Sequence, residues 1–171
     1  MDLYEAIKTR KSVRRFRNLP VEEETVTKLL EAARLAPSAN NSQEWRFVVV
    51  RDPETRKALA DAASRQDFVA EAPVVIVCCA ETDGGVMRCG LQRYPVDATL
   101  AIDHLMLAAA AEGLGTCWVG AFNPGRVKTV LKIPKGVEVV AVLPLGYPEY
   151  PEAQDKNRLP LDRIVHHETW K

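Results

Sequence analysis

The chain has 171 residues, 47% of them hydrophobic, so it can bury one substantial core, and we expect a single domain over residues 1–171. Twenty-three basic residues balance twenty-three acidic ones. That balance argues against a nucleic-acid-binding protein and against a polybasic membrane-surface protein, because both normally carry a clustered positive excess.

Hydrophobic periodicity predicts helices and strands in alternation along the first half of the chain. Apolar faces at helical spacing predict a short helix over 2–9 and a second helix after Pro20. β-branched and aromatic residues predict a strand over 45–50, and a helix over 54–64 follows it. The continuous apolar run 73–80 fits a strand that is covered on both faces.

Residues 96–112 are apolar at nearly every position, which leaves no polar stripe wide enough to face water. A helix that is apolar all round must be covered all round. One sheet and a few helices in a chain of this length can hardly bury both sides, so a second copy of the protein is the expected partner. A central helix of a monomer is the alternative.

The rest of the chain predicts a strand over 116–119, a helix over 124–131, a strand over 137–145 and a Pro-rich polar tail over 147–171. The cysteines match neither a disulfide framework nor the spacing of a zinc site, so we expect buried thiols and no metal. They are Cys78, Cys79, Cys89 and Cys117. Because no apolar leader or membrane-spanning run is present, we expect a cytoplasmic protein that does not contact the membrane.

Three polar segments, far apart in the sequence, could each supply part of an anion site. The first, 10–14, combines arginines, a lysine and a hydroxyl, and Lys156 and Arg158 project to one side of the tail. The loop 37–43 carries five side chains that can read a heterocycle or a polyol: Ser38, Asn40, Asn41, Ser42 and Gln43. Each segment alone could equally be a solvated corner, a surface pair or a self-satisfied turn.

Familiar single-segment motifs are absent from the sequence. Gly113-Leu114-Gly115 lacks the third glycine of a dinucleotide fingerprint and precedes a strand instead of following one, and there is no P-loop. His104 lies in the apolar helix and reads as a core residue, and Cys117 lacks a partner that would make it a nucleophile. No catalytic side chain is therefore predicted.

Taken in order, four motifs resemble those of the flavin-dependent nitroreductase family and span almost the whole chain. They are RKSVRRF at 10–16, EAARLAPSANNSQEWRF at 31–47, GLGTCWVGAF at 113–122 and KNRLPL at 156–161. The resemblance implies an α+β fold with a mixed, antiparallel-rich sheet surrounded by helices. It also implies an intertwined homodimer, whose tail from about 147 extends over the partner, with FMN tightly bound at two interface sites.

The resemblance further implies which residues bind FMN. On one subunit these would be Arg10, Lys11, Ser12, Arg14, Val119, Gly120, Ala121, Lys156 and Arg158, and the other would supply Pro37, Ser38, Ala39 and Asn41, with Gln43 nearby. Arg10, Lys156 and Arg158 would hold the phosphate. Ser12 would lie near the ribityl chain, and Arg14 would lie at the N1/O2 edge, where positive charge favours reduction. A backbone N–H near Gly120 would reach N5.

Two departures from the family pattern stand out. Glu44 occupies a position where the family often has proline, and we expect this to change only the stiffness of the loop. The segment 81–95 leaves room only for a short roof over the flavin. Its substrate-pocket candidates are Gln92, Arg93 and Tyr94.

The expected activity is a ping-pong oxidoreductase, in which NADH or NADPH reduces FMN and a small acceptor such as a nitroaromatic or a quinone then reoxidises it. The chemistry would lie at flavin N5. A specialised flavin reductase, dehalogenase or enoate reductase on the same scaffold is one alternative. A flavin-binding carrier or sensor without turnover is another.

Overall fold

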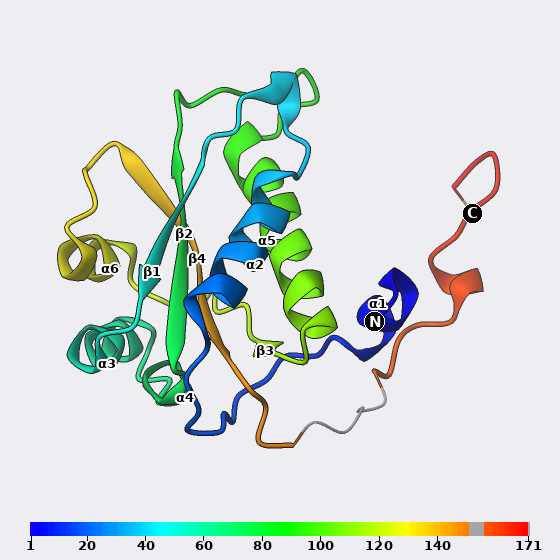
Figure 1. The fold of residues 1–171 in the computed structure, drawn as a ribbon. Helices are drawn as coiled ribbons and strands as arrows, with labels where there is room; N and C mark the ends of the chain where they lie inside the picture. The colour runs from blue at the N-terminus through cyan, green and yellow to red at the C-terminus, as the bar shows by residue number, and fades with distance from the viewer. Residues whose placement is uncertain (151–155, 171) are drawn as a thin grey trace.

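The computed structural model describes residues 1–150 and 156–170. In these residues an antiparallel sheet runs through the molecule in the order β1-β2-β4-β3 (Figure 1). Its strands are β1 (Trp45–Val50), β2 (Val74–Glu81), β3 (Gly115–Thr116) and β4 (Val137–Gly146). A parallel bridge between Ser12 and Thr116 adds the N-terminal segment, so the sheet is mixed. The predicted sheet type is confirmed.

Helices cover both faces of the sheet (Figure 1). One face carries α2 (Glu23–Arg34) and α5 (Arg93–Ala111), and the other carries α3 (Pro53–Ala62), α4 (Phe68–Glu71) and α6 (Pro124–Leu131). The short helix α1 (Leu3–Thr9) packs against α5. The sequence predicted all of these except α4, which has only four residues and therefore too few positions to show a helical period.

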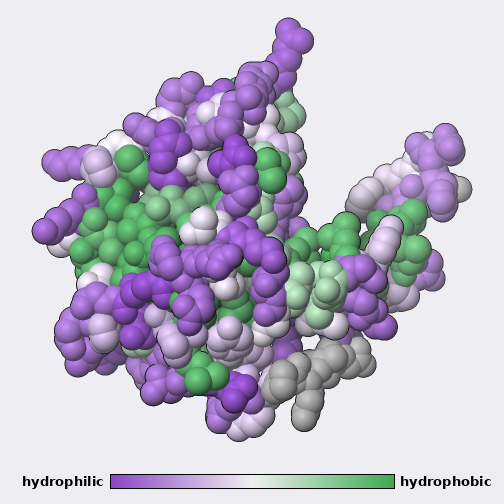
Figure 2. Space-filling view, in the orientation of Figure 1, coloured by the Kyte–Doolittle hydropathy of each residue, from purple (hydrophilic) through white to green (hydrophobic). Residues whose placement is uncertain are grey.

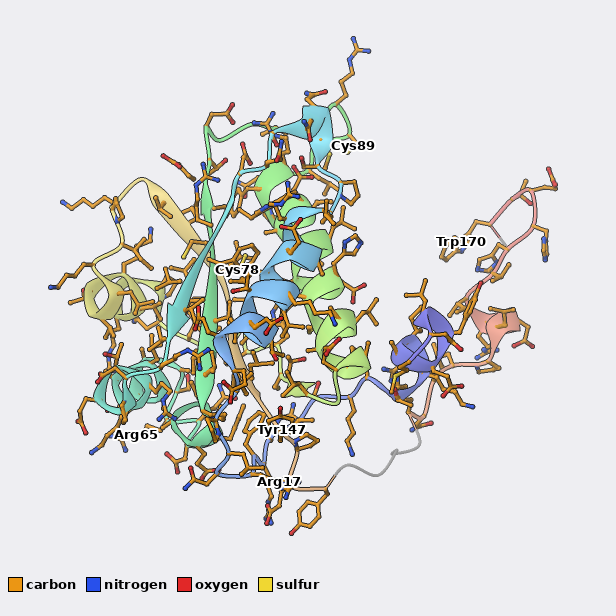
Figure 3. All side chains as sticks on the ribbon, in the orientation of Figure 1. Arg17, Arg65, Cys78, Cys89, Tyr147 and Trp170 are labelled. Atoms are coloured by element: carbon orange, nitrogen blue, oxygen red, sulfur yellow. The ribbon has the colours of Figure 1, made fainter. Side chains whose placement is uncertain are left out.

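Strand β2 explains how the two layers share one sheet. Its side chains alternate, with Val74, Ile76 and Cys78 toward α2 and α5, and Val75, Val77 and Cys79 toward α3, α4 and α6. All six are buried, which is why the strand is apolar without interruption. Cys78 lies between sheet and helices (Figure 3). Burial raises the pKa of both thiols, that of Cys79 to about 11, so both are inert structural residues.

Helix α5 is only partly covered within one chain. It buries Ala98, Ile102 and Leu105 against the sheet, whereas Val96 and Leu100 remain 39% and 40% exposed. The region that the sequence predicted to be apolar all round is therefore open on its outer side. The part of the chain described here has no helix of the length and apolarity needed to cross a membrane.

The C-terminal segment lies to one side of the body, next to α1 (Figure 1). Residues 156–170 contain a single 3₁₀ turn, η2 (Leu161–Arg163). The segment exposes large hydrophobic side chains: Leu159, Leu161, Ile164 and Trp170. Figure 2 shows hydrophobic residues along α1 and this segment. Positions 151–155 and 171 of the predicted tail lie outside the described residues.

Candidate functional site

The basic segment 10–17 is held in an extended form along the edge of β3. The Val13 N–H donates to the Thr116 carbonyl over 2.9 Å, and the Val13 side chain is buried. Neighbouring side chains of an extended segment point in opposite directions, so the burial of Val13 turns Ser12 and Arg14 toward solvent, where both are exposed. The fold therefore presents this motif outward as an exposed ledge.

Cations from both ends of the chain converge on the ledge. Burial lowers the pKa of Lys156, and the positive charges of Arg10 and Arg158 lower it further, so these three groups lie close together. Burial raises the pKa of the Cys117 thiol, and the positive charges of Arg14 and Arg10 partly offset this rise. Arg14 therefore lies near Arg10, in the same cluster of cations. Among residues 1–150 and 156–170 none of these four cations has a carboxylate partner.

Hydrogen bonds to main-chain carbonyls hold the basic side chains in place. Lys156 donates to the Ile7 carbonyl in the last turn of α1, and Arg158 donates to the Lys156 carbonyl over 2.7 Å. Lys11 donates to the Tyr150 carbonyl over 3.0 Å. Positive charges gathered in one place repel one another, so an anion such as phosphate fits this cluster.

We expect inorganic phosphate to raise the Tm of the protein without cofactor, most strongly at low ionic strength. The pKa of Lys156 is lower in the folded chain than its ordinary value, so its charge destabilises the folded state at neutral pH, and this cost is lost as pH rises from the lowered pKa to the ordinary one. The same rise removes a charge that phosphate binds. Above about pH 8, where phosphate is already the dianion, the Tm gain over chloride of equal ionic strength should therefore shrink as pH approaches the ordinary lysine pKa of about 10.4.

A Lys156→Gln variant is the control for this effect. In this variant, phosphate should raise the Tm less at pH 7, and the rise in Tm should depend less on pH. A variant that gains as much as the parent chain would place Lys156 outside the anion site.

Residues 119–121 leave donors free at the surface. Val119 is buried and exchanges two backbone hydrogen bonds with Val142, of 3.0 and 3.2 Å, whereas Gly120 and Ala121 are exposed. Within the described ranges, the N–H groups of these two residues donate no hydrogen bond. A Cβ at Gly120 would meet only the Trp118 indole, 3.6 Å away, so the packing of the chain itself does not demand glycine. The space and the donors fit a ligand that approaches the main chain closely.

The loop 37–43 lies at the other end of the molecule. It is tied to Asp97 in the second turn of α5, whereas Arg10 lines a hollow with Ala110 in the last turn. At 1.5 Å per residue, these two positions on α5 are about 20 Å apart. In Figure 3, Cys89 marks the end of the molecule where this loop lies, and Tyr147 and Arg17 mark the opposite end. One chain therefore brings together the basic motifs but not the amide-rich loop.

Glu44 does more than alter the stiffness of the loop. Its side chain is buried and pairs with Arg93 at 2.7 Å, and Arg93 also pairs with Asp83 at 2.7 Å. The arginine lies against Gly85, where an added Cβ would come within 2.7 Å of the guanidinium. This cluster could not be predicted from the sequence, because its members come from three separate segments.

The segment between β2 and α5 is a compact turn without a helix. The Met87 N–H donates to the Leu91 carbonyl over 2.8 Å, and Val86 bridges to Gln92. Gln92 is exposed at its end, and Tyr94 is half-buried. A substrate pocket formed by Gln92, Arg93 and Tyr94 stays a prediction, and the charge of Arg93 is already engaged by two carboxylates.

A mixed sheet between two helical layers defines an α+β protein, and the cations gathered beside β3 can attract an anionic ligand. The sequence model described as "Nitroreductase family" matches residues 7–66 and 62–147. The chain therefore belongs to the nitroreductase family, a family of oxidoreductases. The predicted family and enzyme class are confirmed.

Individual relatives agree with this assignment. A Thermus thermophilus protein named NADH dehydrogenase is 36% identical over 96% of this chain and 95% of its own. A 5,6-dimethylbenzimidazole synthase from Rhodospirillum rubrum is 39% identical over 81% of this chain and 78% of its own. The solved structure of NADPH:FMN oxidoreductase from Vibrio harveyi, complexed with NAD⁺, superposes with a TM-score of 0.89 at 26% identity. The superposition covers 99% of this chain and 78% of the Vibrio harveyi chain. The predicted cofactors, FMN with NADH or NADPH, are thus cofactors of the nitroreductase family, to which this chain belongs.

Proposed function

We propose that the protein binds FMN and uses it to pass hydride from NADH or NADPH to a small acceptor, such as a nitroaromatic or a quinone, in a ping-pong sequence. The observation that carries this proposal is the cluster of Arg10, Arg14, Lys156 and Arg158, which has no carboxylate partner in the described residues. The family of the chain supports it. On the sequence grounds given above, we also propose a cytoplasmic location.

The residues of the ledge would divide the work of binding. Bound FMN supplies a centre that accepts and donates hydride. Arg10, Lys156 and Arg158 would hold its phosphate through charge-assisted hydrogen bonds, and Ser12 would bind near the ribityl chain. Arg14 would favour reduction by placing positive charge where negative charge develops. No acidic or basic side chain is required, because solvent can exchange the protons.

The N–H groups of Gly120 and Ala121 would face the ring system from the other side of the ledge. Val119 anchors them, because its two hydrogen bonds to Val142 fix the backbone immediately before them. Donors held in place by a strand need no reorganisation when charge develops on the ligand.

We propose that a second copy of the chain completes each site with Pro37, Ser38, Ala39, Asn41 and Gln43. Two observations support a homodimer: the halves of the site lie at opposite ends of α5, and α5 is open on its outer side. A two-fold axis that crosses α5 would bring each end of one chain to the opposite end of its partner. The exposed hydrophobic residues of 159–170 would pack on that partner.

The purified protein should show the visible absorbance of oxidised flavin, or should acquire it when FMN is added. Anaerobic addition of NADH or NADPH should bleach that absorbance, and a quinone or nitroaromatic should restore it. A protein that stays colourless with FMN would overturn the proposal. Flavin that binds but stays oxidised would indicate a carrier without turnover.

A specialised reaction on the same fold is the second candidate. The relative named 5,6-dimethylbenzimidazole synthase supports it through 39% identity over 81% of the chain. Chromatography of the reaction mixture distinguishes the two. Release of 5,6-dimethylbenzimidazole without turnover of quinone or nitroaromatic would favour this candidate.

A further inference from the structure

A buried carboxylate holds loop 37–43. Asp97 is 3% exposed, and its two oxygens accept the Ala39 N–H at 3.1 and 3.2 Å. The hydroxyl of Ser42 donates to the same carboxylate over 3.3 Å. Asp97 lies in a largely apolar helix, beside the buried Ala98 and one turn after the half-buried Arg93. Burying a carboxylate is costly unless hydrogen bonds compensate for the lost water.

The end of the loop is held from the same face of α5. Arg93 lies four residues before Asp97, so the two side chains project to one side of the helix. Arg93 pairs with Glu44, which is 7% exposed and directly follows the loop. With Asp97 bound to Ala39, two adjacent turns of one helix thus fix both the start and the end of the loop.

The loop needs such support because its backbone is strained. Asn40, Asn41 and Gln43 have φ values of 54°, 55° and 49°, in the left-handed region, which asparagine tolerates but which disfavours glutamine. Their side chains are exposed, so packing does not stabilise this shape. Within the loop, the Gln43 N–H donates to the Ser38 hydroxyl over 3.1 Å. The contacts from α5 therefore add an outside support to the hydrogen bonds that the loop makes within itself and with Arg46.

We propose that Asp97 is a positioning residue, which sets loop 37–43 in its ligand-binding shape before the cofactor arrives. This inference rests on the proposed function, in which the loop covers FMN on the partner subunit. Asp97 acts through Ala39 and Ser42 and does not touch the ligand itself. Its contribution is that FMN binding need not then supply the free energy to order the loop.

Two measurements on the protein without cofactor and on the FMN-loaded dimer test the proposal. In Asp97→Ala, amide hydrogen exchange of a peptide covering 37–44 should speed up at least about tenfold, while a peptide covering 74–81 in β2 should not change. FMN affinity, from flavin fluorescence, should fall by about tenfold or more. Asp97→Asn keeps the side-chain volume and one acceptor oxygen. Its exchange rate at 37–44 and its FMN affinity should therefore lie close to those of the parent chain, even if Asp97→Ala folds poorly.

Asp61→Ala, an exposed aspartate on the opposite face of the sheet, is the matched control and should change neither quantity. Unchanged exchange at 37–44 in both Asp97 variants would overturn the proposal. Faster exchange with unchanged FMN affinity would also overturn it, because the role of Asp97 would then be structural only. If the parent chain fails to bind FMN, the proposed function fails, and the exchange data still decide whether Asp97 orders the loop.

Discussion

A single methyl group at Gly115 should displace the basic ledge and cost the protein several kcal/mol of stability. An ideal Cβ at this position would lie 2.5 Å from Val13 Cγ2 and 2.7 Å from Val13 Cβ, and both belong to a buried side chain. In Gly115→Ala, segment 10–17 must move away from β3, which breaks the bond from Val13 to Thr116. We expect a loss of about 2–4 kcal/mol in urea unfolding, since overpacking and a lost ledge hydrogen bond add together.

FMN titration of the same variant should show little or no binding, because the displaced segment carries Arg10, Ser12 and Arg14. Gly136→Ala is the matched control. A Cβ there meets nothing within 4 Å and its φ is not positive, so its stability and affinity should match the parent chain. Parent-like behaviour of Gly115→Ala would show that the ledge tolerates displacement.

The double variant Arg10→Ala/Arg158→Ala should lose FMN affinity by roughly a hundredfold or more. Each removed guanidinium is expected to contribute about 1.5–3 kcal/mol as a charge-assisted phosphate contact, and about 1.4 kcal/mol corresponds to a factor of ten. Arg158→Ala alone should cost about 1.5–3 kcal/mol. Fluorescence titration at fixed ionic strength measures both losses. Arg65→Ala, on the α3 side of the sheet (Figure 3), should leave the affinity unchanged.

Mixed dimers show whether the site is shared between subunits. Pairing an Arg10→Ala/Arg158→Ala subunit with a Ser38→Ala/Asn41→Ala subunit leaves one site with both defects and one site intact, if cations and loop come from different chains. Tight FMN binding at half of the sites is then expected. If every site in the mixture remains weak, each site is built from a single chain.

The sequence predicted the fold well wherever a local period decides the structure. The unbroken apolar run of β2 follows from burial on both faces, and residues 45–50 form a strand with those bounds. Asn123 predicts the start of α6, because its side chain accepts the Arg126 N–H over 3.0 Å. These features depend on residues that are neighbours in the chain.

The candidate site was predictable only in pieces. Its motifs can be recognised in the sequence by their residues and their order. The pairing of Glu44 with Arg93, and of Arg93 with Asp83, cannot, because three segments must meet and no sequence spacing connects them. Asp97 left one signal, an acid inside an apolar helix. A buried carboxylate needs partners, so that position could have been marked as one that binds a backbone elsewhere.

Helix α5 also determines where the chain can tolerate a change of length. Its two ends carry contacts to different halves of the site, so each added residue would shift one half by 1.5 Å and turn it by about 100° relative to the other. In a symmetric dimer both sites would fail together. The tip of the turn between β2 and α5, around residues 87–91, is less constrained, because extra residues there leave both helix ends in place. Insertions meant to reshape the proposed substrate pocket therefore belong at that tip, and the number of residues in α5 should be kept fixed.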